Sequence, residues 1–517
     1  MNKIKKFLYP LAVLWAIVVY FVFQPAINIH SLGFWNYLLF IIVPFFVISF
    51  DYSANPKQFF TNGKNKIFII AIIINVVIVL VADFVGTPYL GGLNAYRNRI
   101  NINGVSDFSQ IGEFDQTQVQ IIDKDISMSL ADRVFGEMGA DIVSQYEISK
   151  NYASVVVNGT MYRVTPVEYS GFIKWLSTKA NGTPGYISVN VTTGDTQFHE
   201  LKEGLKYTSN ACFFNNIDFY LRLKYPTFIY GQTKFEVDDN WNPYWVSEVM
   251  SYSFIGKAPD IKGVVITDAV TGKSEYYDVN EVPSWVDNVY NASLICEQYN
   301  SYGKFTNGLF NFSERGITAT TDDYAYLQKD GHLWMYTGIT SVGNDESNVG
   351  FIYVDLQNKN VIYIVSAGAE EYSARASAEG AVQEKGYTSV FPTMVNIEGE
   401  PVYFMGLKDN AGLIKAYAFV SYKNYQRVGI GSTVNEALKN FTGKTNINSD
   451  NNEDKTIKIA DIQVAVVDGY SIYFIKTDDN NYYQCSIEVS NILPFVKVGD
   501  VLNTVISGNQ IVEIRGE

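Results

Sequence analysis

The chain has 517 residues, 47% of them hydrophobic and 15% aromatic, and its formal net charge is −14. This length exceeds one ordinary core, so we expect several folding units, and the hydrophobic content excludes a disordered chain. Residues 1–83 carry six lysines and two aspartates (a net charge of +4), whereas the remainder carries 33 basic and 51 acidic residues (−18). The acidic remainder argues against nucleic acid as a partner, because phosphates need a basic surface, and against adhesion to anionic lipid.

Three apolar segments near the N-terminus predict a membrane anchor over residues 1–85. They cover residues 7–23, 34–50 and 67–82, and each approaches the roughly 20 residues that span a hydrocarbon core. A cleavable signal peptide is the competing interpretation of the first segment. The bulky residues at 21–25 lack the small-residue cleavage pattern, so we expect three transmembrane helices.

The lysines around these segments predict the orientation of the anchor. The N-terminal tail carries three lysines, segment 51–66 carries three, and segment 24–33 carries none. Because basic loops stay in the cytoplasm, we expect a cytoplasmic N-terminus in the cell membrane and an extracytoplasmic location for residues 86–517. Arg97 and Arg99 lie on the side that this rule disfavours.

The region after the anchor predicts a stalk and then a mixed α+β fold. Residues 86–118 are rich in glycine and asparagine, which is typical of a connecting segment. Residues 119–441 alternate between helical and strand periodicities. Within them, alternating strands flank a Gly or Asn turn in three predicted hairpins, at 185–198, 263–277 and 350–365.

Helical signals accompany these strands. We expect helices over 127–146, 210–223, 371–385 and 433–441. Another helix is predicted to begin at Thr165, with Pro166 at its first position and Glu168 closing a capping box. It is expected to end near residues 181–182 and to bury Phe172, Trp175 and Leu176. A helix laid over antiparallel strands, at least twice, gives an α+β exterior.

The second hairpin carries a local motif, VITDAVTGK, at residues 265–273. A helix followed by such a hairpin resembles the PepSY-type module of protease propeptides and other bacterial envelope proteins. Hairpins 185–198 and 350–365 follow the pattern more loosely. Residues 119–441 are also similar to large membrane-anchored proteins of Gram-positive bacteria, some of them loosely labelled cell-shape proteins. These resemblances imply an envelope setting.

The C-terminal part predicts a separate small domain. Residues 442–456 are polar and without periodicity, which indicates a linker. Residues 457–517 are rich in strands and turns and predict a small β-barrel. Segment 495–501 resembles a strand-turn element of OB-like barrels, but the basic, aromatic face that single-stranded nucleic acid needs is missing.

No catalytic motif is present in the sequence. The three histidines have no zinc-ligand spacing, and no nucleophile elbow occurs. Free thiols are expected, and one disulfide pair remains an open alternative. These residues are His30, His199 and His332, and Cys212, Cys296 and Cys485.

Two acidic pairs are the candidate metal ligands. Asp345 and Glu346 lie in a glycine-flanked loop, and Glu370 and Glu371 begin the helix that follows the third hairpin. If that hairpin brings the pairs together, their oxygens would suit a hard cation such as Ca²⁺. The alternative without an ion is two solvated loops, with the second pair favoured by the helix dipole.

These observations predict a non-enzymatic, membrane-anchored protein that binds, scaffolds or regulates in the cell envelope. Its expected partners are the membrane and another envelope protein, and no catalytic residue or organic cofactor is expected. Two alternatives stay open. One is a cell-wall hydrolase that uses Asp or Glu, and the other is an accessory subunit of a membrane transporter.

Overall fold

In the computed structural model, the chain forms two compact units, Met1–Phe441 and Thr442–Glu517. The structure describes residues 2–49, 63–90, 92–321, 323–341, 347–443, 452–467, 470–490, 492–507 and 510–515.

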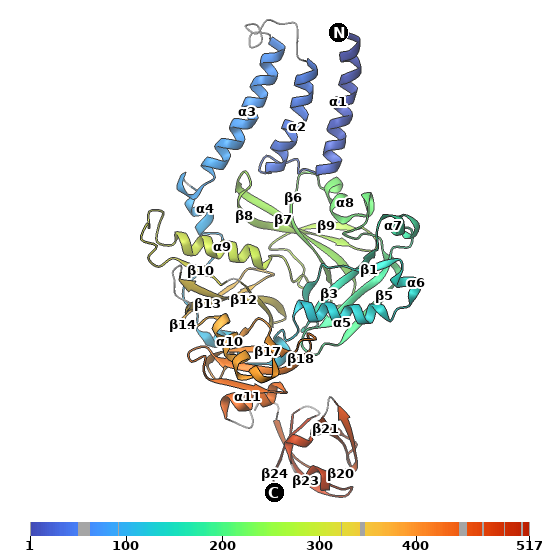
Figure 1. Cartoon of the computed structure of the whole chain (residues 1–517), viewed down its shortest axis with the longest axis vertical. Helices are drawn as coiled ribbons and strands as arrows, with labels where there is room; N and C mark the ends of the chain where they lie inside the picture. Colours follow the sequence, from blue (N-terminus) through green and yellow to red (C-terminus); the bar gives the residue numbers. More distant parts are fainter. Residues whose placement is uncertain are drawn as a thin grey trace. The chain divides into compact units, whose positions relative to one another are not determined.

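Three apolar helices begin the first unit: α1 (Asn2–Phe23), α2 (Leu32–Ser49) and α3 (Gly63–Val85) (Figure 1). Helix α2 and residues Asn65–Val85 of α3 are long and apolar enough to cross a membrane, and the apolar part of α1, Phe7–Phe23, is shorter. Nearly all their side chains are unburied. Because such a surface is unfavourable in water, these helices support a membrane anchor.

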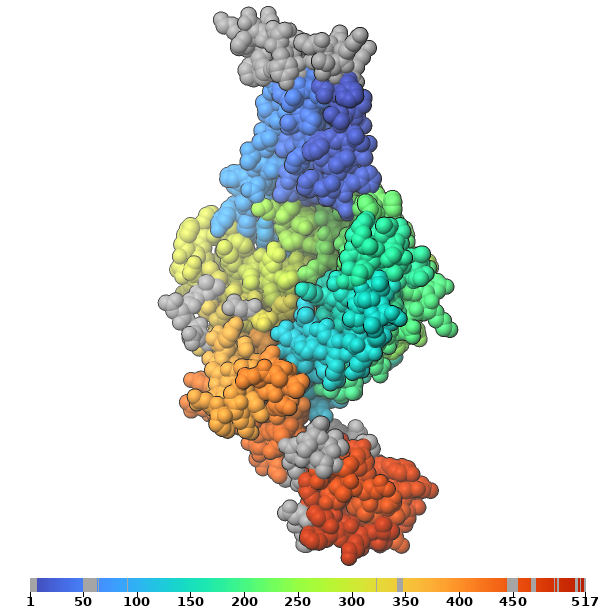
Figure 2. Space-filling view, turned by 45° about the vertical axis from the view of Figure 1, so that its right-hand side comes forward, coloured from blue at the N-terminus to red at the C-terminus, as the bar shows by residue number. Residues whose placement is uncertain are grey.

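The ends of these helices contact the body of the first unit (Figure 2). The Ile27 amide donates to the Pro226 carbonyl at 2.8 Å, and the His30 carbonyl accepts from Gly256 at 2.9 Å. Lys257 pairs with Asp83, the end of α3, at 2.8 Å. The extramembrane ends of the helices are therefore attached to one part of the body.

Four antiparallel sheets make up this body, and a helix precedes each of them. In the first sheet, strand β3 (Thr160–Tyr169) pairs with β1 (Tyr146–Ile148) through its C-terminal part and with β2 (Ala153–Val157) through its N-terminal part. Two further strands follow. The third and fourth sheets repeat this plan. In the second sheet, a single strand with a register shift between Tyr230 and Thr233 replaces the two short ones.

The remaining elements of the body belong to the four sheets and to the helices that accompany each sheet. The first has α5 (Lys124–Gly136), α6 (Ala140–Val143), α7 (Phe172–Thr178), β4 (Thr183–Asn190) and β5 (Thr196–Leu205). The second has η4 (Phe213–Asn215), α8 (Ile217–Lys224), β6 (Ile229–Val237), β7 (Pro243–Phe254), β8 (Lys257–Asp268) and β9 (Ser274–Asp278). The third has α9 (Ala292–Phe305), β10 (Thr318–Thr320), β11 (Ala325–Lys329), β12 (His332–Ser341), β13 (Ser347–Asp355) and β14 (Val361–Ala369). The fourth has α10 (Glu371–Ala381), η5 (Gln383–Lys385), β15 (Thr388–Ser389), β16 (Thr393–Ile397), β17 (Glu400–Lys408), β18 (Ile414–Ser421), β19 (Val428–Gly431) and α11 (Val434–Thr442). The three predicted hairpins correspond to β4–β5, β8–β9 and β13–β14 and are confirmed.

The middle sheets are buried on both faces. Along β12, Leu333 and Met335 enter a core shared with the first and second sheets, whereas Trp334 and Tyr336 enter a core shared with the fourth. Successive side chains of a strand point to opposite faces, so one strand contributes to two cores. The sheets therefore form one packed body.

Two expectations for this unit are wrong. Residues 86–118 contain η1 (Pro88–Leu90), α4 (Leu93–Arg97), η2 (Phe108–Ile111) and η3 (Gln116–Gln118). Ile100 in this segment is buried, and Ser106 donates to the Tyr363 carbonyl, so the segment packs on the sheets and is no stalk. The helix predicted to begin at Thr165 begins only at Phe172, as α7 (Phe172–Thr178), because residues 165–169 belong to β3. Trp175 is buried as expected, whereas Phe172 and Leu176, also expected to be buried, are exposed.

The second unit is a closed barrel with the strand order β20-β21-β22-β24-β23. All pairings are antiparallel except that between β22 and β24, which is parallel. The first strand begins at Asn452, inside the predicted linker 442–456, because its N-terminal part pairs with β23. The elements are β20 (Asn452–Val467), β21 (Tyr470–Thr477), β22 (Tyr482–Ser486), η6 (Ile487–Val489), η7 (Leu493–Phe495), β23 (Val501–Ser507) and β24 (Gln510–Arg515).

Candidate functional site

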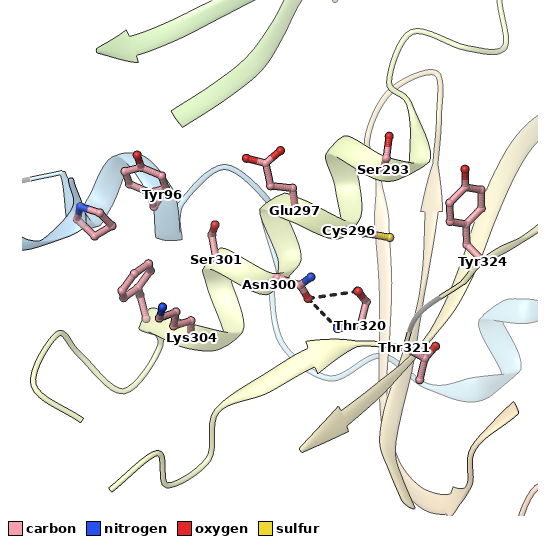
Figure 3. Close-up of a pocket in the computed structure, with 12 residues that line it drawn as sticks. Tyr96, Ser293, Cys296, Glu297, Asn300, Ser301, Lys304, Thr320, Thr321 and Tyr324 are labelled. Atoms are coloured by element: carbon pink, nitrogen blue, oxygen red, sulfur yellow. Dashed lines mark hydrogen bonds between the residues drawn. The ribbon is translucent and has the colours of Figure 1, made fainter. Parts of the chain in front are cut away.

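A cavity of about 640 Å³ lies along one face of α9, between this helix, α4 and the region of β10 (Figure 3). We call it the α9 groove. It is lined by Pro88, Tyr96, Ser293, Cys296, Glu297, Asn300, Ser301, Lys304, Phe305, Thr320, Thr321 and Tyr324.

The helix that forms the groove has a strong start signal that we did not recognise in the sequence. The Asn291 side chain accepts a hydrogen bond from the Leu294 amide at 2.8 Å, as an N-cap does. Its amide group donates to both oxygens of the buried Glu248 carboxylate at 2.9 and 3.1 Å. Ile295 and Tyr299, four residues apart, are fully buried. The cap and this spacing fix which face of α9 meets the groove.

The groove face of α9 carries one acid, one base and neutral polar groups. Glu297 and Lys304 are both exposed. The Asn300 side-chain oxygen accepts from the Thr320 amide at 2.7 Å and from its hydroxyl at 3.2 Å (Figure 3). Burial raises the pKa of the Cys296 thiol to about 11. Since the thiolate is the nucleophile, this raised pKa makes Cys296 a weak nucleophile at neutral pH.

The histidines in the body are held in structural contacts. The His199 ring stacks between Tyr186, at 4.6 Å, and Trp241, at 4.5 Å, and lies 2.8 Å from the hydroxyl of buried Ser188. Burial lowers the pKa of His199. His332 contacts Asp355 at 2.8 Å. The three cysteines are free, as expected.

The structure describes one of the two acidic pairs predicted to bind Ca²⁺. Asp345 and Glu346 lie outside the described residues. Glu370 takes the N-cap position of α10, and Glu371 is buried. The Ca²⁺ site at these four residues stays a prediction. In the part of the chain that is described, no group of three or more His, Cys, Asp or Glu residues could hold a metal ion.

Glu371 is enclosed by hydrogen-bond donors. The Tyr336 hydroxyl donates to one of its oxygens at 2.7 Å, and the Asn348 amide group donates to the other at 3.3 Å. Burial raises the pKa of Glu371. These contacts explain how a carboxyl group is accommodated inside the body, and they make Glu371 a core residue.

A second buried acidic site was not visible in the sequence. The Asp287 amide donates to Glu236 Oε2 at 3.0 Å, and the Val156 amide donates to Asp287 Oδ2 at 2.6 Å. Glu236 Oε1 has no partner among the described atoms. Burial raises the pKa of both carboxyl groups, and the charge of Glu236 raises that of Asp287 further. These residues connect the first and second sheets to the segment before α9.

Comparisons with known proteins give no relative for this chain. No family model and no curated protein matches its sequence. Among solved structures, a variant of an exo-β-1,3-galactanase from Phanerochaete chrysosporium has 10% identity and a TM-score of 0.16, over 71% of this chain and 70% of the galactanase. A levansucrase mutant from B. megaterium has 9% identity and a TM-score of 0.17, over 81% of this chain and 97% of the levansucrase. Such scores carry no argument about fold or activity.

Proposed function

We propose that this protein is a non-enzymatic, membrane-anchored, extracytoplasmic binding or scaffolding protein of the cell envelope, and that the α9 groove receives a segment of another envelope protein. The observation that carries this proposal is the chemistry of the groove. The groove offers neutral hydrogen-bonding groups, one acid and one base, and burial raises the pKa of its cysteine to about 11.

The lining of the groove suits a polypeptide. Tyr96, Phe305 and Tyr324 supply aromatic surface, and aromatic residues are enriched in protein interfaces. Glu297 and Lys304 lie two turns apart on α9 and offer one charge of each sign to a partner. Pro88 and Tyr96, which line one side of the groove, follow α3 closely in sequence, which favours a partner in the envelope.

The hydrolase alternative finds less support. Glycoside hydrolysis generally uses two carboxyl groups about 5–9.5 Å apart across the scissile bond. Glu297 is the single carboxylate among the groove residues. The accessory-subunit alternative is compatible with the groove, because a transporter would be one such partner in the envelope.

The same proposal covers the module types. We interpret each helix followed by an antiparallel sheet as a PepSY-like unit, an interpretation supported by the hairpin motif at 265–273. We interpret the second unit as OB-like, which is supported by its five strands and by the parallel pairing of β22 with β24.

Photocrosslinking in cells tests the partner. A photoreactive residue replaces Ser301 in the groove, and a matched one replaces exposed Lys423 in the fourth sheet's loop. We expect one discrete crosslinked envelope protein from position 301 and none from position 423. Equal crosslinks at both positions, or none at 301, would contradict the proposed binding role of the groove.

Two further assays separate the alternatives. The full chain in nanodiscs is incubated with peptidoglycan, and release of fragments that is abolished by Glu297→Gln would support a hydrolase and overturn the proposal. Protease added to intact cells should degrade the chain after Val85. Degradation only after lysis would contradict the extracytoplasmic orientation.

A further inference from the structure

One side of the body exposes a contiguous apolar surface beside the membrane anchor. It consists of Phe172, Ile173 and Leu176 of α7 and Phe213 and Phe214 of η4, and we call it the α7–η4 face. Each of these side chains is 50% to 71% exposed. An apolar surface gathered from two segments marks an interaction site more often than single exposed residues do.

Ring contacts connect this face to the first membrane helix. Phe213 lies 6.1 Å from Trp175, the buried residue of α7, and Phe214 lies 5.5 Å from Phe219 of α8. Phe219 in turn stacks on Phe21 of α1 at 5.8 Å. Figure 1 shows α8 directly beside the end of α1. A series of ring contacts therefore runs from the anchor through buried Phe219 of α8 to η4.

The backbone at η4 holds one ring outward at a cost. Phe213 has φ of +53°, in the left-handed region that bulky residues rarely adopt. Such strained residues are found where a functional contact compensates them. Water gives no compensation to an aromatic ring that is 60% exposed.

The charges around the face fit the headgroup zone of a bilayer. Segments 172–179 and 210–216 contain two lysines, Lys174 and Lys179, and no carboxylate, while Glu147 accepts from Asn210 at 3.5 Å and Asp218 is exposed on α8. Lys179 lies over the Trp175 ring at 4.7 Å. Aromatic rings and lysines with apolar stems are typical of the membrane–water interface.

We propose that the α7–η4 face dips into the lipid surface next to α1, so that the body is held against the bilayer by this face as well as by its helices. The occupant is lipid, because the face is apolar and ring contacts connect it to a helix of the membrane anchor. The contact is mainly apolar, so it does not require anionic lipid, and it does not depend on the side of the membrane or on the partner of the α9 groove.

Lipid crosslinking tests this proposal. The full chain is placed in phosphatidylcholine nanodiscs that contain a lipid with a diazirine in its acyl chain, and adducts are located by mass spectrometry. We expect adducts on peptides that contain Ile173 and Phe214, as abundant as the adducts on peptides from the ends of α1 and α3. Peptides that contain Leu413 and Tyr425, which are 47% and 46% exposed in loops of the fourth sheet, are the matched control.

Substitutions make the test specific. Ile173→Asp should abolish the adducts on α7, whereas Ile173→Ala should keep them, and both should leave melting unchanged because this side chain is 71% exposed. Adducts on α7 and η4 no higher than on the control peptides would overturn the proposal. Protein–protein crosslinks from this face in place of lipid adducts would overturn it too, by assigning the face to a second copy or another protein.

Discussion

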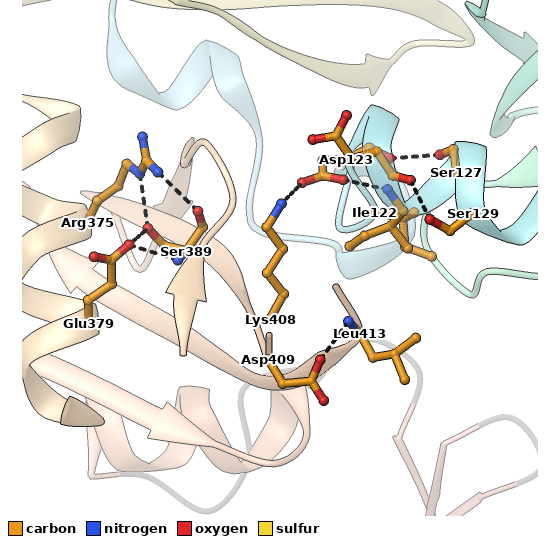
Figure 4. A network of polar contacts seen from close by, with 12 residues as sticks. Ile122, Asp123, Ser127, Ser129, Arg375, Glu379, Ser389, Lys408, Asp409 and Leu413 are labelled. Atoms are coloured by element: carbon orange, nitrogen blue, oxygen red, sulfur yellow. Dashed lines mark hydrogen bonds and ion pairs between the residues drawn. The ribbon is translucent and has the colours of Figure 1, made fainter. Parts of the chain in front are cut away.

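An ion pair between helix α5, which precedes the first sheet, and strand β17 of the fourth sheet allows a quantitative test of how these parts of the body are held together (Figure 4). Asp123 Oδ1 accepts from the Ile126 amide at 2.9 Å and so caps α5. Its other oxygen accepts from Lys408 Nζ of β17 at 2.6 Å. The two side chains are 23% and 22% exposed. One carboxylate therefore both caps helix α5 and connects it to the fourth sheet.

The two roles can be separated by substitution. Asp123→Ala removes the cap, which costs about 1 kcal/mol, and the ion pair, which at this partial exposure contributes up to about 1 kcal/mol. Asp123→Asn keeps an oxygen for the cap and removes the charge. We therefore expect a loss of about 2 kcal/mol for the alanine variant and about 1 kcal/mol or less for the asparagine variant.

Native-state hydrogen exchange of the α5 amides is the appropriate assay, because a body of four sheets need not unfold in one step. A double-mutant cycle with Asp123→Asn and Lys408→Met gives the coupling energy, expected at up to about 1 kcal/mol. Thr433→Ala is the control, since Thr433 caps α11 without an ion pair. It should weaken α11 and show no coupling to Lys408. A coupling energy near zero, together with unchanged exchange of the α5 amides in Lys408→Met, would refute the proposed connection between α5 and the fourth sheet.

Three other predictions concern buried groups. The pKa values of Glu236 and Asp287 are raised in the folded state, so the folded chain holds more protons than the unfolded chain. Its stability therefore falls as pH rises above the ordinary pKa values of carboxyl groups. The double variant Glu236→Gln, Asp287→Asn should show a smaller fall of melting temperature between pH 5 and 8. Asn291→Ala should cost about 1–3 kcal/mol, because it removes the α9 cap and a donor to a buried carboxylate, and it should raise exchange of the α9 amides. Burial raises the pKa of Cys485 to about 12 and that of Cys296 to about 11, so alkylation of both in the native chain at pH 7.5 should be slow and become fast in denaturant.

The sequence predicted the elements whose periodicity is local. Hairpin 350–365 alternates apolar and polar residues around its turn and forms β13 and β14. The predicted helix 371–385 is formed by α10 and η5, and it ends at Gly386, whose φ of +65° suits glycine. Turn chemistry and alternation act over a few residues, so they are legible without the fold.

The predicted start of a helix at Thr165, seven residues before α7 begins, is wrong for a tertiary reason. Thr165 and Val167 are fully buried in β3, and this burial outweighs a local capping box. Pro166 is tolerated in β3 because β2 pairs with this strand only as far as Val164, and β1 pairs with it only from Val167. On that side, no strand pairs with Pro166, which has no amide hydrogen to donate. Only the complete sheet shows this gap.

The buried acidic site could not be predicted for a similar reason. Glu236 alternates with Phe235 and Val237 along β6, as a solvent-facing residue does, and Asp287 lies in the irregular segment before α9, so the sequence marks neither carboxylate as buried. Their burial arises because the first and second sheets and the segment before α9 meet around them. The α9 groove depends on the same assembly, since its lining comes from three separate segments.

The segment 86–118 offers a last test, because a stalk and a packed strap respond differently to one substitution. The Phe114 ring lies 5.2 Å from Phe404 and 5.3 Å from Phe419 of the fourth sheet, and the Phe114 amide donates to the Asn396 carbonyl at 2.9 Å. Truncating a fully buried Phe costs about 3–5 kcal/mol, so the half-buried Phe114 should cost about 1.5–3 kcal/mol on Phe114→Ala.

Phe310→Ala is the matched control, since this ring is 75% exposed and its loss should change stability by less than about 0.5 kcal/mol. Hydrogen exchange of β17 and β18 in the full chain measures both variants. If the two variants behave alike, residues 86–118 act as a connector. If Phe114→Ala alone loosens the fourth sheet, the segment that follows α3 is a packed part of the body and contributes to the stability of that sheet.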